Sequence, residues 1–175
     1  MNNKSLPLKF FERKPEVVAR DLIGKYLVRE MGESRQALMI TEVEAYAGAE
    51  DLASHARFGK TKRNEVMFGK AGVFYIYFIY GMYFMLNVVC QKRGVPSAVL
   101  IRGVAGITGP GKLTKNFKID KSLSGKQAEI KSGLWFEDRG SKIKTERYRR
   151  IGVNYAGEWS RKLWRFTIEN KNIVE

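Results

Sequence analysis

The sequence predicts a mixed α+β fold in a single domain that spans residues 1–175. Three observations lead to this prediction. A chain of 175 residues is typical of one domain and can bury a core without a disulfide or a structural metal. One segment carries the start and stop signals of a helix, and several others have the alternation or the aromatic and β-branched content of strands. No repeat, low-complexity tract or linker divides the chain.

The elements are expected in the following order. Pro15 begins a short helix, EVVARDLIG, which ends at Gly24. KYLVRE then forms a strand, MGES a turn and RQALMITEVEAY a second strand, so these two strands pair as a hairpin. Residues 48–72 are expected to be loop and short helix, and SAVLIRG a buried strand. Residues 103–145 are expected to be mostly loop, with a short strand in GLWFEDRG, and RKLWRFTIEN forms the last strand.

The stretch from Val73 to Cys90, VFYIYFIYGMYFMLNVVC, has no charged residue in 18 positions. A transmembrane helix is therefore one interpretation. Tyrosines are spread through the stretch instead of lying at its ends, where a membrane interface would place them. The sequence favours a hairpin of two strands, FYIYFIY and YFMLNVV, with a turn at Gly81 and with Tyr80 and Met82 at its tip. Two apolar strands would place this hairpin at the centre of the sheet.

The charge of the chain indicates a polyanionic partner. Lys and Arg number 32 against 18 Asp and Glu, which gives a net charge of +14. Nucleic acid is the expected partner, and an anionic membrane surface is the alternative. One Cys and one His exclude an internal disulfide and the usual zinc sites. The N-terminus lacks the features of a signal peptide, so a reducing intracellular compartment is expected.

One strand combines acidic and aromatic side chains. Alternation along ITEVEAY places Glu42, Glu44 and Tyr46 on one face. The opposite face then carries Met39, Thr41, Val43 and Ala45. The first face is either a solvated surface or the wall of a pocket.

Aromatic residues elsewhere favour the pocket. Tyr75 and Tyr77 share a face of their strand, and aromatic rings can sandwich a nucleobase. An aromatic side chain at a hairpin tip can also wedge between base steps. A carboxylate such as Glu44 would repel phosphate, but it could activate a water or stabilise a developing cation. His55, the only histidine, is either a structural hydrogen-bonding group or a pocket residue.

Several blocks of the sequence, in order, resemble one family over most of the chain. They are TEVEAYAGAEDLASHA, KRNEVMF, FYIYFIYGMYFMLNVV, AVLIRG, GPGKL and IGVNYAGEWSRK. The family is that of the alkyladenine, or 3-methyladenine, DNA glycosylases of the mammalian type. The resemblance implies one domain around a curved antiparallel β-sheet, with a protruding β-hairpin that enters the minor groove.

The resemblance also assigns roles to residues. Glu44 would orient and deprotonate the water that attacks C1′ of a flipped nucleotide. Arg102 and the backbone carbonyl of Ile151 would help to hold that water. The base pocket would consist of Tyr46, His55, Tyr77 and Asn87. Tyr80 would intercalate into the gap that the flipped base leaves.

The implied function is that of a monofunctional DNA glycosylase of base excision repair. It would hydrolyse the N-glycosidic bond of an alkylated or deaminated purine and leave an abasic site. No metal and no cofactor are expected. The expected partner is double-stranded DNA with damaged purines, not a membrane. The chain would act as a monomer in the cytoplasm, associated with the nucleoid if the source is a bacterium.

The sequence departs from the family in one region. After Arg102 it runs through GVAGIT directly to GPGKL, where the family has a longer helix and loop. Two alternatives to the glycosylase stay open, the first of them because of this departure. One is a catalytically inactive nucleic-acid binding module that uses the same aromatic platform. The other is a peripheral membrane protein that inserts the aromatic hairpin.

Overall fold

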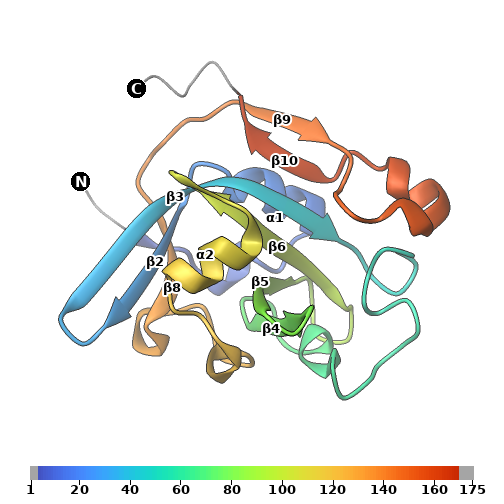
Figure 1. Cartoon of the computed structure of the whole chain (residues 1–175), viewed down its shortest axis with the longest axis horizontal. Helices are drawn as coiled ribbons and strands as arrows, with labels where there is room; N and C mark the ends of the chain where they lie inside the picture. The colour runs from blue at the N-terminus through green and yellow to red at the C-terminus, as the bar shows by residue number, and fades with distance from the viewer. Residues whose placement is uncertain (1–3, 170–175) are drawn as a thin grey trace.

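The computed structural model describes residues 4–169. Within this range, ten strands form one antiparallel sheet that does not close on itself (Figure 1). Its main path runs β1-β8-β2-β3-β6-β5-β4; β10 pairs with β3 and β9, and β7 pairs with β6. The strands are β1 (Lys4–Ser5), β2 (Tyr26–Met31), β3 (Ser34–Tyr46), β4 (Phe74–Ile79), β5 (Tyr83–Cys90), β6 (Ser97–Val104), β7 (Ile107–Thr108), β8 (Leu134–Asp138), β9 (Thr145–Tyr148) and β10 (Arg165–Ile168).

Helices are short and few in the described residues. The α-helices are α1 (Pro15–Leu22) and α2 (Pro110–Asn116). The 3₁₀ segments are η1 (Leu8–Phe10), η2 (Glu65–Phe68), η3 (Lys121–Leu123), η4 (Ile130–Ser132) and η5 (Asn154–Arg161). The mixed α+β fold predicted from the sequence is confirmed.

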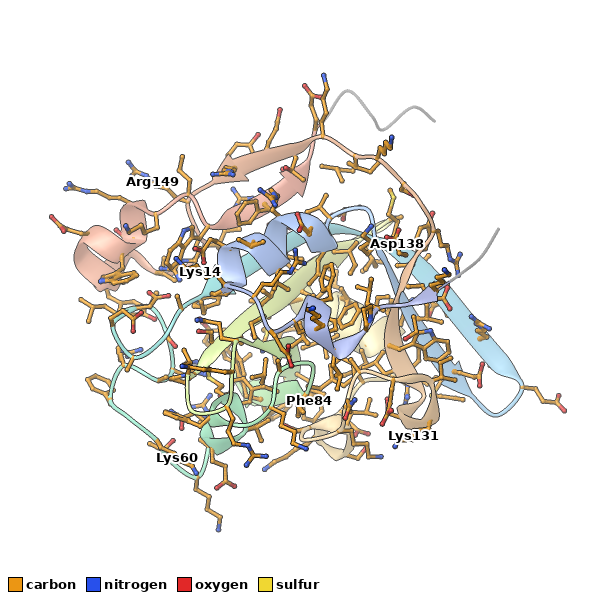
Figure 2. All side chains as sticks on the ribbon, turned by 180° about the vertical axis from the view of Figure 1, so that it is seen from behind. Lys14, Lys60, Phe84, Lys131, Asp138 and Arg149 are labelled. Atoms are coloured by element: carbon orange, nitrogen blue, oxygen red, sulfur yellow. The ribbon has the colours of Figure 1, made fainter. Side chains whose placement is uncertain are left out.

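The core lies where the two α-helices meet the sheet. α1 packs against β3, β6 and β10, and α2 packs against β5, β6 and β7. α2 lies in front of the β3–β6 pair in Figure 1, and α1 comes to the front when the molecule is turned in Figure 2. Ile40, Ile101 and Phe166 from the sheet and Leu22 from α1 are fully buried in one contiguous cluster. Their burial fixes the central strands that carry the site.

Several predicted elements are confirmed. α1 starts at Pro15, and Gly24, just after its end, has a φ of 82° that a side chain would disfavour. β2 and β3 pair as the predicted hairpin. β6, β8 and β10 correspond to the strands expected in SAVLIRG, GLWFEDRG and RKLWRFTIEN, although Asn170 of the last segment lies outside the described residues.

The stretch from Val73 to Cys90 is the β4–β5 hairpin, not a helix. In the described part of the chain, no helix has the length and apolar content to cross a bilayer. Tyr80 and Gly81 occupy the turn with φ values of 55° and 66°, the pattern of a type I′ turn. The Met82 N–H donates to the Ile79 carbonyl at 3.2 Å and closes it. The tip side chain of Tyr80 is 83% exposed and that of Met82 is 62% exposed.

The predicted central position of this hairpin is wrong, because β4 is the last strand of the main path. Residues 124–128 cover its outer edge. The Phe74 N–H donates to the Lys126 carbonyl, and the Gly125 N–H donates to the Phe74 carbonyl, both at 2.8 Å. The Ile76 N–H donates to Ser124 Oγ at 3.1 Å. Hydrogen bonds with this polar loop thus satisfy the outer edge of β4. An apolar strand can therefore lie at the edge of the sheet.

The predicted faces of β3 are correct beyond Glu42 but wrong before it. The β3–β6 register shifts between Ile40 and Glu42 and again between Glu42 and Val43. Because of this bulge, Ile40, not Met39, joins Val43 and Ala45 in the core. A bulge changes which side a residue faces, and alternation alone cannot reveal it.

α2 lies in a region expected to be mostly loop. Pro110 occupies its first turn, and Gly111 lets it approach β5 closely. A Cβ added at Gly111 would lie 2.5 Å from Cδ1 of Tyr83. Glycine and proline in successive positions are typical of a loop, but here they start a helix that buries one face against the sheet.

Candidate active site

A pocket of about 420 Å³ lies between the central strands, the β4–β5 hairpin and the segment that follows β9. Its size suits a ligand as large as a nucleobase. Seven of the eight site residues predicted from the sequence line it: Tyr46, His55, Tyr77, Tyr80, Asn87, Arg102 and Ile151. The eighth, Glu44, contacts three of these residues.

Glu44 lies on β3 with no exposed side-chain surface. Its Oε2 accepts a hydrogen bond from the Tyr46 hydroxyl at 2.8 Å, and its Oε1 accepts one from the Ile151 N–H at 2.7 Å. Arg102 Nη1 lies 3.6 Å from Oε2. β3 alternation places Glu44 and Tyr46 on the same face, which is why they can bond two residues apart. The carboxylate is thereby fixed at both oxygens.

Burial raises the pKa of the Glu44 carboxyl above its usual range. The charge of Arg102 and the hydrogen bonds from Ile151 and Tyr46 act in the opposite direction, and Glu42 adds a smaller increase. A base that must take a proton near neutral pH works best with a pKa raised in this way. Burial, followed by the charge of Glu44, also raises the pKa of Tyr46 well above its normal value, so this hydroxyl stays a donor.

Arg102 lies on β6 between two carboxylates. Its Nε donates to Glu42 Oε1 at 3.2 Å, and the same oxygen accepts from Arg165 Nη1 at 3.2 Å. The register shift at Glu42 leaves Arg102 as the extra residue of β6. The bulge therefore provides the position from which the guanidinium can reach Glu42 and Glu44 together.

His55, Tyr75 and Tyr77 form an aromatic cluster on one wall. His55 Nδ1 and the Tyr75 hydroxyl share a hydrogen bond of 3.0 Å, and the rings of His55 and Tyr77 are 4.5 Å apart, edge to face. Burial, then Arg63 and Arg57, lower the pKa of His55 to about 4. His55 is therefore neutral at physiological pH. Burial raises the pKa of Tyr75 to about 12, which keeps its hydroxyl protonated.

Asn87 lies on β5, buried beneath the pocket. Its Nδ2 donates to the backbone carbonyls of Tyr75 at 3.2 Å and Met85 at 3.3 Å. These two bonds fix the orientation of the amide.

Ile151 contacts Glu44 through its amide N–H, whereas the resemblance pointed to its carbonyl. Its side chain is half exposed at the pocket rim. Tyr80 lines the pocket from the hairpin tip.

Two residues of the site were not predicted. Arg150 and Asp51 form a two-pronged ion pair behind Tyr46, with no exposed side-chain surface on either partner. In the sequence, Asp51 follows Glu50 in a run with several acidic residues, and Arg150 ends the basic run RYRR. Their separation of 99 positions in the chain conceals the pairing. A buried Arg carries no local sequence signal.

Within residues 4–169, no group of three or more His, Cys, Asp and Glu side chains is arranged to hold a metal ion. The arrangement instead offers an oriented carboxylate beside an aromatic pocket. A buried, hydrogen-bonded carboxylate behind the lining of such a pocket, in a chain of net charge +14, favours one class of protein, the enzymes that act on nucleic acid.

Comparison with known proteins narrows the class. The family model described as "Methylpurine-DNA glycosylase (MPG)" matches residues 9–108 and 105–172. Proteins of Legionella pneumophila (strain Corby), Methanocella arvoryzae and a Wolbachia of Brugia malayi are 43%, 42% and 41% identical to this chain. These alignments cover 98%, 97% and 96% of this chain and 98%, 94% and 99% of the relatives. Each relative is named "Putative 3-methyladenine DNA glycosylase".

The chain belongs to the methylpurine-DNA glycosylase family. The family match divides into two segments at residues 105–108, within the region where the sequence is expected to be shorter than the family. The relatives align with this chain over nearly their whole length, so the shorter form is not peculiar to it. β7 and α2 fill this part of the fold, and Pro110 of α2 lines the pocket.

Proposed function

We propose that this protein is a monofunctional DNA glycosylase of base excision repair that acts on alkylated or deaminated purines in duplex DNA. Family membership supports the enzyme class, a hydrolase of N-glycosyl bonds, and the names of the relatives agree with it. The observation that carries the proposal for the site is Glu44: a carboxylate with no exposed surface, oriented by hydrogen bonds from two residues that line an aromatic pocket.

The base must leave the stack before its bond to C1′ can be reached. The positively charged chain attracts the DNA, and Tyr80, exposed at the hairpin tip, fills the space that the extruded base leaves. The purine enters the pocket, where Tyr46 and Tyr77 come from different strands and offer two aromatic walls. Stacking of this kind contributes about 1–3 kcal/mol per base.

Glu44 then acts as the general base. Water attacks C1′ while the bond from C1′ to the base nitrogen breaks, and the base leaves with the electron pair. The water proton passes to Glu44, and Arg102 and the Ile151 carbonyl orient that water. The transition state resembles an oxocarbenium ion, so the carboxylate also stabilises it by charge. An alkylated, cationic purine leaves as the neutral base, and hypoxanthine, which leaves as an anion, takes up a proton that balances the one passed to Glu44. The products are the free base and an abasic site, with the strand uncut.

The test is single-turnover base release from a duplex oligonucleotide with one hypoxanthine and from alkylated genomic DNA. Wild type is compared with Glu44→Gln. We expect wild type to release base and Glu44→Gln to bind the duplex without release. Strand breaks should appear only after the abasic site is cleaved with alkali.

Glu137→Gln is the matched control. Glu137 is also a buried carboxylate, bound by Arg35, Arg139 and Trp135, but it lies on β8 and does not line the pocket. This variant should release base at the wild-type rate. Binding by wild type without release from either substrate would favour a catalytically inactive nucleic-acid binding module.

A further inference from the structure

The ion pair of Arg150 and Asp51 is the most extensively bonded charged group beside the pocket. Arg150 Nη1 donates to Asp51 Oδ2 at 2.6 Å, and Nη2 donates to Oδ1 at 2.9 Å. Nη1 also donates to the Ala45 carbonyl at 3.0 Å, and Nη2 to the Trp159 carbonyl at 3.1 Å. Since neither side chain has exposed surface, the guanidinium is fixed by four hydrogen bonds in the interior.

Arg150 contacts both groups that donate hydrogen bonds to Glu44. It precedes Ile151, whose N–H donates to Glu44, so fixing Arg150 fixes that amide. Its guanidinium lies 4.8 Å from the centre of the Tyr46 ring, over its face. Its bond to the Ala45 carbonyl holds the β3 backbone between Glu44 and Tyr46.

Asp51 folds the loop that follows β3. Its Oδ2 accepts from the Ala47 N–H at 3.1 Å, and its Oδ1 accepts from the Ala53 N–H at 3.0 Å. The same loop meets the segment after β9 at a second place, where the Arg57 guanidinium lies 5.2 Å from the centre of the Tyr155 ring. The ion pair therefore joins two segments that are far apart in the chain and that both border the pocket.

Stability alone does not account for a pair of this kind. Removing two charges from water costs several kcal/mol per ion, and well-packed apolar residues often stabilise a fold equally well. Arg150 is also neutralised by Asp51, so its charge is not available to offset that of Glu44. The pair instead fixes the positions of its neighbours, because the planar guanidinium of Arg150 donates hydrogen bonds in fixed directions.

We infer that Arg150 and Asp51 are positioning residues of the reaction, which hold the Ile151 amide and the Tyr46 ring in place to donate to Glu44. The inference rests on the proposed function, because Glu44 is taken as the base. Misplacement of a catalytic group by about 1 Å can cost on the order of 100-fold in rate. Loss of the pair should therefore lower the rate of base release without lowering the affinity for DNA.

Loss of the pair should also change the pH dependence. The Ile151 and Tyr46 hydrogen bonds favour the ionised form of Glu44, so weaker bonds raise the pKa of Glu44 and move the acid limb of the rate profile to higher pH. The other charged and titratable groups that face Glu44 are Glu42 on the same strand, Arg102 on β6 and Tyr77 on β4. Arg165, opposite Glu44 on β10, pairs with Glu42. The substitutions leave all of these in place.

The experiment measures single-turnover base release against pH, and duplex affinity, for Arg150→Lys and Asp51→Asn. We expect the maximal rate constant to fall about 10-fold or more, the acid limb to move upward, and the dissociation constant to change less than about threefold. Glu137→Gln should lose similar thermal stability with an unchanged profile. If the two variants lose stability only, and keep the wild-type rate and profile at temperatures where they are folded, the inference is wrong.

A measurement on wild type keeps the test decisive if both variants fail to fold. Hydrogen exchange of the Ile151 amide should be slow, because the amide is held against a buried carboxylate. The Gly140 amide is a suitable comparison, since it donates to the exposed Asp138 carboxylate at 2.9 Å. Equal exchange rates at the two amides would overturn the inference. If wild type releases no base at all, the proposed function fails, whereas a protected Ile151 amide would show that the positioning geometry exists.

Discussion

Removal of the Tyr46 hydroxyl is the most direct test of how hydrogen bonding sets the pKa of Glu44. In Tyr46→Phe the ring remains as a pocket wall, but the bond of 2.8 Å to Glu44 Oε2 is lost. A hydrogen bond to a charged group contributes about 1.5–3 kcal/mol, and here it favours only the ionised carboxylate. Since 1.36 kcal/mol corresponds to one pKa unit, the acid limb of the rate profile should move up by about one pH unit or more.

The assay is single-turnover base release from one damaged duplex across the pH range in which both proteins are folded. Well below the limb, the rate of Tyr46→Phe should fall about 10-fold relative to wild type, and on the plateau the two rates should stay within about threefold. Tyr148→Phe is the matched control, because Tyr148 also donates its hydroxyl to a glutamate, Glu146, but on the exposed surface of β9. An acid limb that does not move in Tyr46→Phe would refute Glu44 as the base that this bond tunes.

Four further outcomes are expected. Because burial raises the pKa of Glu44, the free energy of unfolding falls as pH rises through that pKa. Glu44→Gln should therefore melt at a higher temperature than wild type at neutral pH. The difference should shrink in acid, and calorimetry can measure it. Tyr80→Ala should weaken base release about 10-fold or more while the melting temperature stays unchanged, since this side chain is 83% exposed. Gly111→Ala places a methyl group 2.5 Å from Tyr83 and should cost about 1–3 kcal/mol in the free energy of unfolding, measured with urea. Duplex affinity should fall steeply with salt, with a slope of about −0.9 per phosphate contacted; a flat dependence would argue against DNA as the partner.

The composition of single segments predicted much of the fold. Pro15 and Gly24 gave the limits of α1, and the tyrosines spread from Val73 to Cys90 favoured a hairpin over a membrane helix. The resemblance brought seven residues that line one pocket, and alternation on β3 explains why Glu44 and Tyr46 can bond. These features depend on local pattern or on motif, which a single sequence contains.

Other features depend on contacts between distant segments. The bulge at Thr41 reverses the faces of the first part of β3, and only the pairing with β6 reveals it. The loop that covers β4 explains why an edge strand can be apolar. Asp51 and Arg150 meet across 99 positions, so neither residue type nor spacing indicates their pairing. The pattern of a sequence does not show which buried polar groups will form hydrogen bonds or ion pairs with one another.

The pairing of β10 with β3 has a consequence for synthesis. Arg165 lies opposite Glu44 in that pairing, and the amide that bonds Glu44 comes 107 positions later in the chain. A chain still leaving the ribosome can form its β2–β3 and β4–β5 hairpins, which are local, and Tyr46 can already bond Glu44 Oε2, but the amide that bonds Oε1 is still missing. Contacts of such long sequence separation also slow folding. The pocket is therefore completed last, and a chain terminated before residue 150 would retain most of the sheet and much of the positive charge without the amide that fixes Glu44 Oε1.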